Sequence, residues 1–158
     1  MRRKDREITD RAKIMDIIDR CDCCRVGFFD AEAKQVYIVP LNFGYTEEEG
    51  KVTFYFHGAK EGRKMELIQK APAVGFEMDT NYKLNEADEA CEYSARFQSV
   101  IGNGRMRMIE DMEGKKHALN MVMKHATGKD DWEYDENMLK VVATFKLEVE
   151  ELSCKEHA

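Results

Sequence analysis

A group of cations lies where a short helix is predicted to begin, in the stretch YFHGAKEGRK at residues 55–64. The start of a helix carries roughly half a unit of positive charge and free N–H donors, so Lys60, Arg63 and Lys64 are unfavourable there unless an anion is also present. His57 ends the preceding strand-like run. One imidazole, backbone N–H groups and two or three cations at this spacing predict a site for a single phosphate group.

Two glycines fit this interpretation. Gly58 permits a tight turn after the strand, and Gly62 allows a ligand to approach the first helical turn closely. The alternative is an ordinary solvated face, on which Glu61 and Glu66 relieve the repulsion between the cations. The sequence contains no G-x-x-x-x-G-K-[ST] pattern, so a nucleotide-triphosphate P-loop is excluded and the phosphate would belong to another ligand.

Length and composition indicate a single domain over residues 1–158, long enough to form a core without disulfides or a structural metal. The 25 basic and 31 acidic residues give a net charge of −6, which argues against nucleic acid as a partner. No apolar run approaches the roughly 18 residues of a membrane span, and the start of the chain lacks a signal-peptide core. We therefore expect a cytoplasmic protein without a membrane partner.

The elements that position the basic stretch follow from hydrophobic periodicity. Apolar residues at helical spacing predict a helix over residues 9–20 with Thr9 as its N-cap, a second over residues 60–70, and a third over residues 111–125 with Gly128 near enough to end it. Strand-like runs are predicted at residues 24–30, 35–43, 51–57, 73–80, 93–110 and 139–152. The polar segments between them are predicted as turns and loops, chiefly residues 46–50 and 81–92.

About six mostly antiparallel strands and three helices place the chain in the mainly β class. The first three strands are expected in meander order, and the barrel is expected over about residues 24–150. A six-stranded antiparallel barrel is favoured because closure removes exposed strand edges. Within the fifth strand, the glycines of GNG at residues 102–104 predict a bulge rather than a dinucleotide fingerprint.

Three stretches carry a resemblance to a known family: VYIVPLNFGY, TFYFHGAKEGRKMELIQKAPAVGFEMD and FQSVIGNGRM. They resemble the pyridoxamine 5′-phosphate oxidase-related superfamily of flavin-binding split barrels. The pair VPLNFGY and YFHGAKEGRK is similar to the 5-nitroimidazole-resistance (Nim) branch. The similarity runs from about Cys24 to Ala126, and the basic helix start is its most specific element.

The resemblance implies a homodimer that binds flavin mononucleotide (FMN) at the subunit interface. It implies that His57, Lys60 and Lys64 hold the phosphate with Arg63 as a neighbour, and that the backbone of the VPLN segment runs along the flavin ring. A simpler explanation for Pro40 is that it marks an edge strand. The full set of implied cofactor-binding residues is Val39, Pro40, Leu41, Asn42, Phe56, His57, Lys60, Arg63, Lys64 and Ser99.

The function implied by the resemblance is an FMN-dependent reductase of small aromatic or nitro compounds, with NAD(P)H or another carrier as electron donor. Because the C-terminal Arg-x-His pattern of pyridoxamine phosphate oxidases is absent, vitamin B6 oxidation is the weaker alternative. The same residues also fit a flavin- or heme-binding carrier without turnover, or a scaffold that has lost its cofactor. No side chain stands out as a catalytic proton donor.

The cysteines, histidines and aromatic residues outside this motif have simpler explanations. Cys21, Cys23 and Cys24 lack the paired C-x-x-C spacing of structural zinc sites, so reduced thiols and no metal are expected. His117 and His125 are eight residues apart, which does not match the i, i+4 spacing of a helical metal site. The aromatic pair Trp132 and Tyr134 is predicted either to cover a ligand or partner, or to pack onto the barrel.

Overall fold

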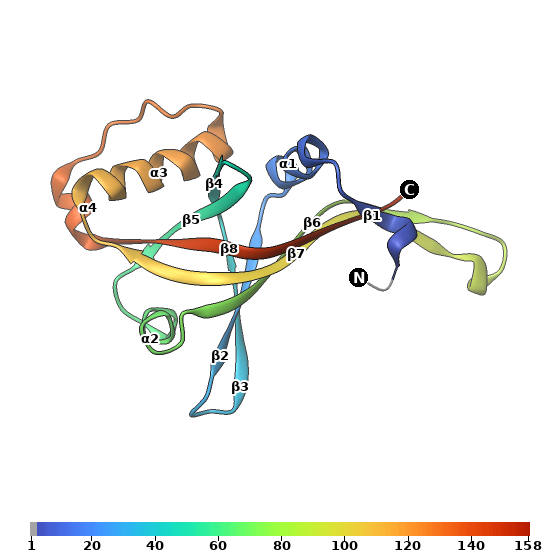
Figure 1. Ribbon diagram of the computed structural model, residues 1–158, viewed down its shortest axis with the longest axis horizontal. Helices are drawn as coiled ribbons and strands as arrows, with labels where there is room; N and C mark the ends of the chain where they lie inside the picture. Colours follow the sequence, from blue (N-terminus) through green and yellow to red (C-terminus); the bar gives the residue numbers. More distant parts are fainter. Residues whose placement is uncertain (1–2) are drawn as a thin grey trace.

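The antiparallel sheet is built from strands whose side chains alternate between a buried and an exposed face, as in the run Cys24, Val26 and Phe28 on the buried side of β2. The computed structural model describes residues 3–158 (Figure 1). Its strands are β1 (Glu7–Ile8), β2 (Cys24–Asp30), β3 (Gln35–Leu41), β4 (Gly44–Glu48), β5 (Lys51–Ala59), β6 (Ala73–Asn85), β7 (Ser94–Ile109) and β8 (Val142–His157). Its helices are α1 (Arg11–Arg20), α2 (Arg63–Lys70), α3 (Met112–Thr127) and α4 (Glu136–Val141), with 3₁₀ turns η1 (Lys4–Arg6) and η2 (Ala90–Glu92).

The strands follow the order β3-β2-β6-β7-β8-β5-β4, with β1 paired to β8. Every pairing is antiparallel, which confirms the mainly β, antiparallel barrel class. Within residues 3–158 the ladder ends at β3 on one side and β4 on the other, so the barrel is split and its closure is not completed by hydrogen bonds. The described residues form eight strands rather than the expected six.

The expected meander of the first three strands is wrong, because residues 44–48 form β4 and pair with β5. The hairpin turn is only the pair Glu49 and Gly50, whose φ angles of 50° and 79° are both positive. Two consecutive residues with positive φ form a type I′ turn, whose twist matches that of the flanking strands. The acidic run resembles a loop because glutamate is uncommon in strands, whereas here it lies on an exposed edge.

Other element ends also differ from expectation. Asp10 rather than Thr9 caps α1, with its carboxylate accepting a hydrogen bond from the Lys13 N–H at 2.7 Å. The second helix begins at Arg63, so Lys60 lies in the preceding loop. The short α4 was not predicted. In contrast, the Asp111 cap and the left-handed Gly128 end of α3 are confirmed, as is the bulge at residues 103–104.

The core lies between the curved sheet and the helices that cover it. The largest fully buried side chains include Phe28, Phe43, Phe54, Phe56 and Phe145. Figure 1 shows α2 and α3 on opposite sides of the strands β7 and β8. α3 packs on β4 and β5, with Ala118 and Val122 against Tyr55. No helix in the described range is long and apolar enough to cross a membrane.

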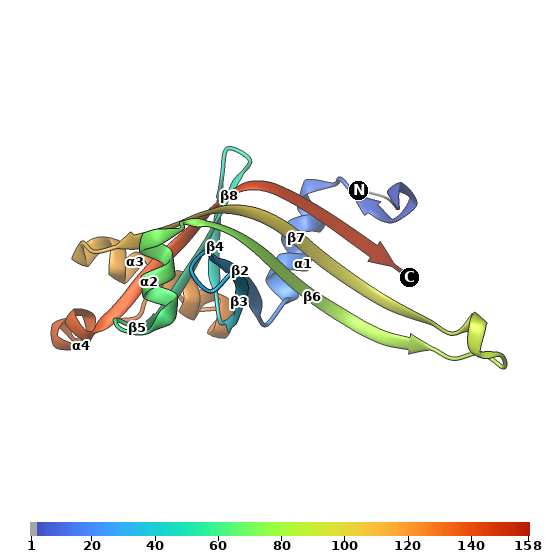
Figure 2. The same cartoon turned by 90° about the horizontal axis from the view of Figure 1, so that it is seen from below.

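The far ends of β6 and β7 form a ribbon that projects beyond the rest of the molecule (Figure 2). Residues 81–85 were expected in a loop but continue β6, after a register shift between Thr80 and Lys83. Asn81 has a φ of 63°, which provides the local distortion that lets pairing resume. The polar composition of residues 81–85 therefore did not predict the solvent-exposed strand that they form.

Gly44 provides a direct test of the packing between β4 and α3. A Cβ atom at this position would lie 2.1 Å from the backbone carbon of Met121, so neither a rotamer change nor side-chain motion can relieve the clash. We expect Gly44→Ala to lower the free energy of unfolding by roughly 3 kcal/mol or more, measured by urea denaturation. Gly75→Ala is the control, because its Cβ would meet its nearest atom at 3.8 Å. Equal stability of the two variants would contradict this packing.

Candidate functional site

The start of α2 is a strand-turn-helix junction without a side-chain cap. Gly62 occupies the N-cap position with φ 114° and ψ 168°, a conformation that is nearly restricted to glycine. Its carbonyl accepts hydrogen bonds from the Met65 and Glu66 N–H groups, and no side chain caps the helix. The N–H groups of this helix end therefore lack a side-chain cap, and Glu66 is the acidic residue of its first turn.

Lys64 lies across Gly58 at this junction. A Cβ atom added to Gly58 would be 2.9 Å from the Lys64 Nζ, so glycine makes room for the ammonium group. The Nζ also lies 5.3 Å from the centre of the Phe145 ring, a cation–π distance. Burial lowers the pKa of Lys64, and within residues 3–158 no carboxylate forms an ion pair with it.

His57, the residue before Gly58 in β5, is a second basic group whose pKa responds to the charge of Lys64. Its imidazole is reachable from solvent, yet partial burial lowers its pKa, and the charge of Lys64 lowers it further. An anion bound near either group would stabilise its protonated form. Because successive strand residues alternate between faces, His57 and the Gly58 side on which Lys64 lies are on opposite faces of β5, and the two groups are linked here only by the effect of the Lys64 charge on the imidazole. That they hold one phosphate together stays a prediction.

Lys60 occupies the loop before α2 and faces a lysine that the sequence analysis missed. It lines a pocket of about 250 Å³ together with Gln69, Met108, Glu110 and Lys115. Lys115 is buried and donates hydrogen bonds to the carbonyl groups of Leu139 at 2.7 Å and Val142 at 2.9 Å. Burial, and then the charge of Lys60, lower its pKa. Two adjacent lysines at residues 115–116 are typical of an exposed helix face, so the sequence did not indicate that Lys115 is buried.

Arg63 differs from its two lysine neighbours because its charge is already matched. Its guanidinium donates to Asp30 Oδ2 at 2.9 Å and lies 4.7 Å from the centre of the Tyr37 ring. The Ala33 N–H and the Arg63 guanidinium both lower the pKa of Asp30. Arg63 therefore fixes the start of α2 to the β2–β3 hairpin, while Lys60 and Lys64 remain without acidic ion-pair partners among the described residues.

The predicted ring-contact segment lies on an edge strand. Leu41 is buried in the core and Val39 packs against it, whereas Pro40 and Asn42 are exposed. Pro40 pairs with Arg25 on the only strand neighbour of β3 in the described chain, so the edge-strand explanation of the proline is confirmed. Pro40 and Asn42 are the members of this segment available to a ligand.

Two predicted residues lie apart from the basic site. Phe56 is fully buried and stacks on Phe145 with ring centres 5.5 Å apart. It therefore contributes to the site only by packing against Phe145, whose ring lies beside Lys64. Ser99 is half-buried in β7, ten residues before Ile109. Ile109 and His57 both pair with Thr144 of β8, so Ile109 marks the level of the basic site. Ten residues of strand span roughly 33 Å, so one protomer does not bring Ser99 to the basic site.

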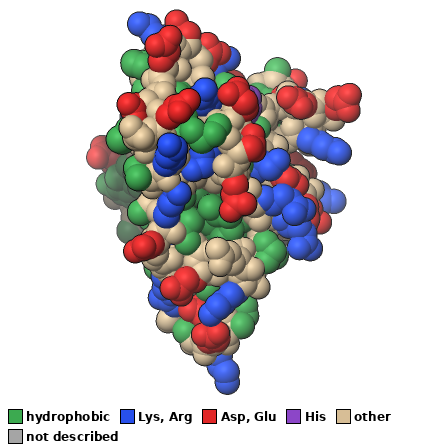
Figure 3. Space-filling view, turned by 90° about the vertical axis from the view of Figure 1, so that its left-hand side faces the viewer, with side chains coloured by type: hydrophobic (Ala, Val, Ile, Leu, Met, Phe, Trp, Pro, Cys, Tyr) green, Lys and Arg blue, Asp and Glu red, His purple; other side chains and the backbone are tan. Residues whose placement is uncertain are grey.

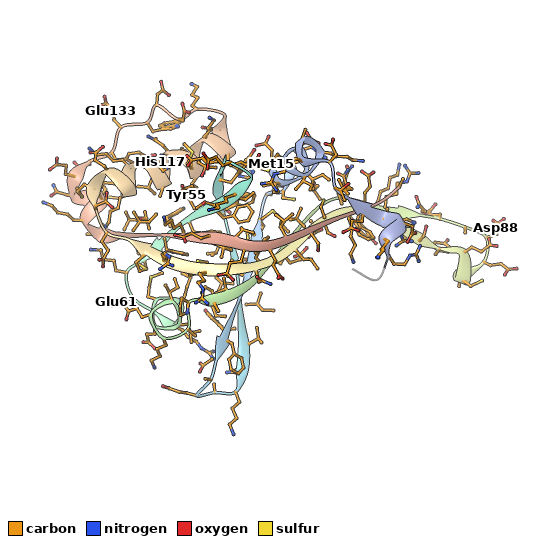
Figure 4. The ribbon with its side chains drawn as sticks, viewed as in Figure 1. Met15, Tyr55, Glu61, Asp88, His117 and Glu133 are labelled. Atoms are coloured by element: carbon orange, nitrogen blue, oxygen red, sulfur yellow. The ribbon has the colours of Figure 1, made fainter. Side chains whose placement is uncertain are left out.

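The remaining candidates have structural contacts. The His125 Nε2 lies 3.0 Å from the Asp19 carbonyl oxygen and its ring packs on Phe43, which joins α3 to α1. His117 packs edge-on against Tyr55 (Figure 4). The Tyr134 hydroxyl donates to an α3 amide oxygen at 3.0 Å, so it packs onto the helix layer.

The surface around α2, α3 and α4 mixes basic, acidic and hydrophobic side chains (Figure 3), so the basic site is local.

All five cysteines are free thiols. Burial raises the pKa of Cys21 to about 12 and that of Cys154 to about 11, and it also raises the pKa of Cys24. These thiols are therefore poor nucleophiles near neutral pH. Within residues 3–158, no group of three His, Cys, Asp or Glu side chains is arranged to hold a metal ion.

The fold and the junction at α2 define an antiparallel split barrel with a basic strand-turn-helix site. A family model described as pyridoxamine 5′-phosphate oxidase matches residues 10–156, and the chain belongs to this family. A candidate 5-nitroimidazole antibiotic resistance protein from Bacteroides thetaiotaomicron is 36% identical over 95% of this chain and 86% of that chain, with a TM-score of 0.81. The family resemblance inferred from the sequence is thereby confirmed.

Two more distant structures share the fold. The flavocytochrome Anf3 from Azotobacter vinelandii is 20% identical over 100% of this chain and 72% of its own, with a TM-score of 0.79. A FAD and heme binding protein from Mycobacterium smegmatis is 16% identical over 96% of this chain and 73% of its own, also with a TM-score of 0.79. No curated protein matches the sequence significantly.

The electropositive surroundings of His57 predict a defined pH dependence. Because its pKa in the folded protein lies below the ordinary 6.5, the unfolded chain binds more protons at this residue as the pH falls through about 6.5. We therefore expect wild-type protein to lose stability relative to His57→Gln between pH 7.5 and pH 5, measured by urea denaturation. In NMR titrations, Lys64→Gln should raise the pKa of His57, whereas Lys70→Gln should leave it unchanged. A His57 pKa above 6.5 without added anion would contradict this arrangement.

Proposed function

We propose that the chain binds FMN and acts as a reductase of small aromatic or nitro compounds. The observation that carries the proposal is the Lys64 ammonium, which lies at an uncapped helix start without an ion-pair partner in the described chain and near enough to His57 to lower its pKa. Two ammonium groups, an imidazole and free helix N–H groups are the donors that a phosphate monoester requires. A flavin with a phosphate on its side chain matches the family and this donor set.

The chain's own residues would bind and orient the cofactor. His57, Lys60 and Lys64 hold the phosphate, and Arg63 keeps the helix start in place through Asp30. Pro40 and Asn42 on the exposed edge of β3 lie against the ring in this proposal. Bound FMN supplies two-electron transfer from a donor such as NAD(P)H to a substrate on its open face. The Nim-type substrate class is supported by the 36% identity to the Bacteroides protein.

We further propose that the active unit is a homodimer with the cofactor at the subunit interface. The separation of Ser99 from the basic site supports two subunits at one site, because a cofactor that contacts both would receive them from different protomers. The protein would act as one domain spanning residues 1–158, of which the first two lie outside the described residues. Its five free cysteines fit a reducing compartment such as the cytoplasm.

Flavin retention tests the phosphate site. Wild-type protein incubated with FMN and passed through gel filtration should keep the flavin absorbance bands. Lys60→Ala combined with Lys64→Ala should weaken FMN binding by about 100-fold, because two charge-assisted contacts are removed. Lys70→Ala is the matched control, since it removes one cation from the same helix while lying in an ion pair with Glu32. Well-folded wild type that retains no FMN would overturn the proposal.

Substrate reduction tests the catalytic part of the proposal. Under anaerobic conditions with FMN and an excess of NADPH or NADH, we expect wild-type protein to convert a 5-nitroimidazole to its amine in three two-electron cycles. Each nitro group then consumes three equivalents of NAD(P)H and releases two water molecules, and mass spectrometry follows the conversion. The double lysine variant should lose this activity in proportion to its lost flavin. Pyridoxamine phosphate in air is the comparison substrate, and its oxidation in place of nitro reduction would favour the oxidase alternative. Retained flavin or heme without turnover of either substrate would favour a carrier.

A further inference from the structure

Lys115 of α3 carries an ammonium group that the chain covers but does not neutralise. The residue is 7% exposed, and within residues 3–158 no carboxylate forms an ion pair with it. It donates hydrogen bonds to the carbonyl groups of Leu139 and Val142. Because an ammonium has three N–H donors, one donor has no protein acceptor in the described chain. A covered charge is unfavourable without compensation, so this donor and its charge are available to an anion.

A structural role explains only part of this arrangement. The two bonded carbonyl groups lie at the C-terminal end of α4, where a cation is favourable. That role does not require Lys60, which lines the same pocket and whose charge lowers the pKa of Lys115. Within residues 3–158 Lys60 has no ion pair either. Two cations on one small pocket repel each other, and an anion between them would be attracted by both.

The pocket lies at one end of the sheet, where the end of β7 and the start of β8 lie beside α2 and α3 (Figure 1). Its lining includes Gln69, Met108 and Ala143. Glu110 is the acidic member of the described lining, and it is exposed and pairs with neither lysine within that range. At about 250 Å³ the pocket is smaller than the roughly 300–1,000 Å³ of sites that enclose a whole drug-sized ligand. It therefore suits one anionic group of a larger ligand.

The pocket adjoins the Lys64 site across one pair of strands. Gly58, over which the Lys64 ammonium lies, pairs with Ala143, and Ala143 lines the pocket. Paired residues point to the same face of a sheet with Cβ atoms roughly 4.5–5.5 Å apart. Since a Cβ atom on Gly58 would be 2.9 Å from the Lys64 Nζ, this ammonium lies within roughly 9 Å of the Ala143 side chain. Two anion sites this close can bind two neighbouring phosphates.

We propose that Lys60 and Lys115 form a second phosphate site, which binds a phosphate group of a dinucleotide beside the flavin phosphate at Lys64. The inference rests on the proposed FMN function and extends it, because a flavin monophosphate leaves Lys115 without an anion. Lys60, already assigned to the flavin phosphate, then borders both phosphates. Two dinucleotides supply the second one: FAD, in which it is linked to the first, and NAD(P)H, the electron donor.

Lys115→Met separates the second phosphate site from the first. If the flavin supplies the second phosphate, apo wild type should bind FAD at least about 10-fold more tightly than FMN in isothermal titration calorimetry. If the donor supplies it, FMN-loaded wild type should bind ADP-ribose, which carries the pyrophosphate of NAD(P)H without the nicotinamide. Lys115→Met should weaken that binding about 10-fold or more and change FMN affinity less than about two-fold, because it removes one charge-assisted contact.

Lys116→Met is the matched control, because Lys116 is the next residue of the same helix and already pairs with Glu113 at 3.4 Å. It should bind FMN, FAD and ADP-ribose as wild type does. Lys115→Met that also binds all three as wild type does would overturn the second phosphate site.

Glu110→Gln keeps the proposal testable if the loss of Lys115 disturbs α4. This variant removes the carboxylate of the pocket at an exposed position, so the fold should be unaffected. It should tighten binding of the same dinucleotide about three-fold and leave the urea midpoint unchanged, since the repulsion of a phosphate by the carboxylate is lost. Dinucleotide binding that is unchanged or weaker in Glu110→Gln would overturn the proposal.

The same titrations separate this inference from the proposed function. FMN that binds more tightly than riboflavin, with no effect of Lys115→Met on FAD or ADP-ribose, would support the function and overturn the second site. ADP-ribose binding to apo protein that depends on Lys115, in a chain that retains no FMN, would uphold the phosphate site of Lys60 and Lys115 and overturn the function.

Discussion

The Lys64 ammonium that lies across Gly58 is the contact on which the arrangement of the site depends. Its position requires a glycine at the end of β5, because any side chain there would displace the ammonium. It also requires the ring of Phe145 beneath it, which is held by stacking on Phe56. Lys64 and His57 are both partly desolvated, so an anion would gain more from them than from lysines in open water. A phosphate would complete a charge balance that the described chain leaves open.

The split barrel makes this junction possible. β5 lies between β4 and β8, and its last residues pair with β8 alone, through Gly58 opposite Ala143 and Ala59 opposite Val142, before the chain turns into α2. The helix is then fixed from a distant part of the sequence, since Arg63 binds Asp30 and lies over the ring of Tyr37 in the β2–β3 hairpin. The three cations of the motif therefore divide between two tasks. Arg63 positions the helix, while Lys60 and Lys64 keep their charge available to a ligand.

Local signals made the junction and the family predictable from the sequence. The glycine at residue 62 and the capped α3 depend on neighbours in the chain. The strand end expected at His57 and the turn expected at Gly58 are wrong, because β5 continues to Ala59 and Gly58 pairs with Ala143 of β8. The missed features depend on distant contacts. Glu47 and Glu48 form a strand because β5 is present to pair with them, and Lys115 is buried only because the carbonyl groups near α4 receive its hydrogen bonds. Residues 81–85 continue β6 because β7 is present to pair with them.

The affinity of apo protein for FMN compared with riboflavin, measured by isothermal titration calorimetry, tests the central claim most directly. The two ligands share the isoalloxazine ring and differ by the phosphate alone. If Lys60, Lys64 and His57 form a phosphate site, FMN should bind at least 100-fold more tightly, and the difference should shrink as salt is added. Equal affinities, or a difference that survives the loss of both lysines, would show that the uncompensated charge at the start of α2 serves another purpose.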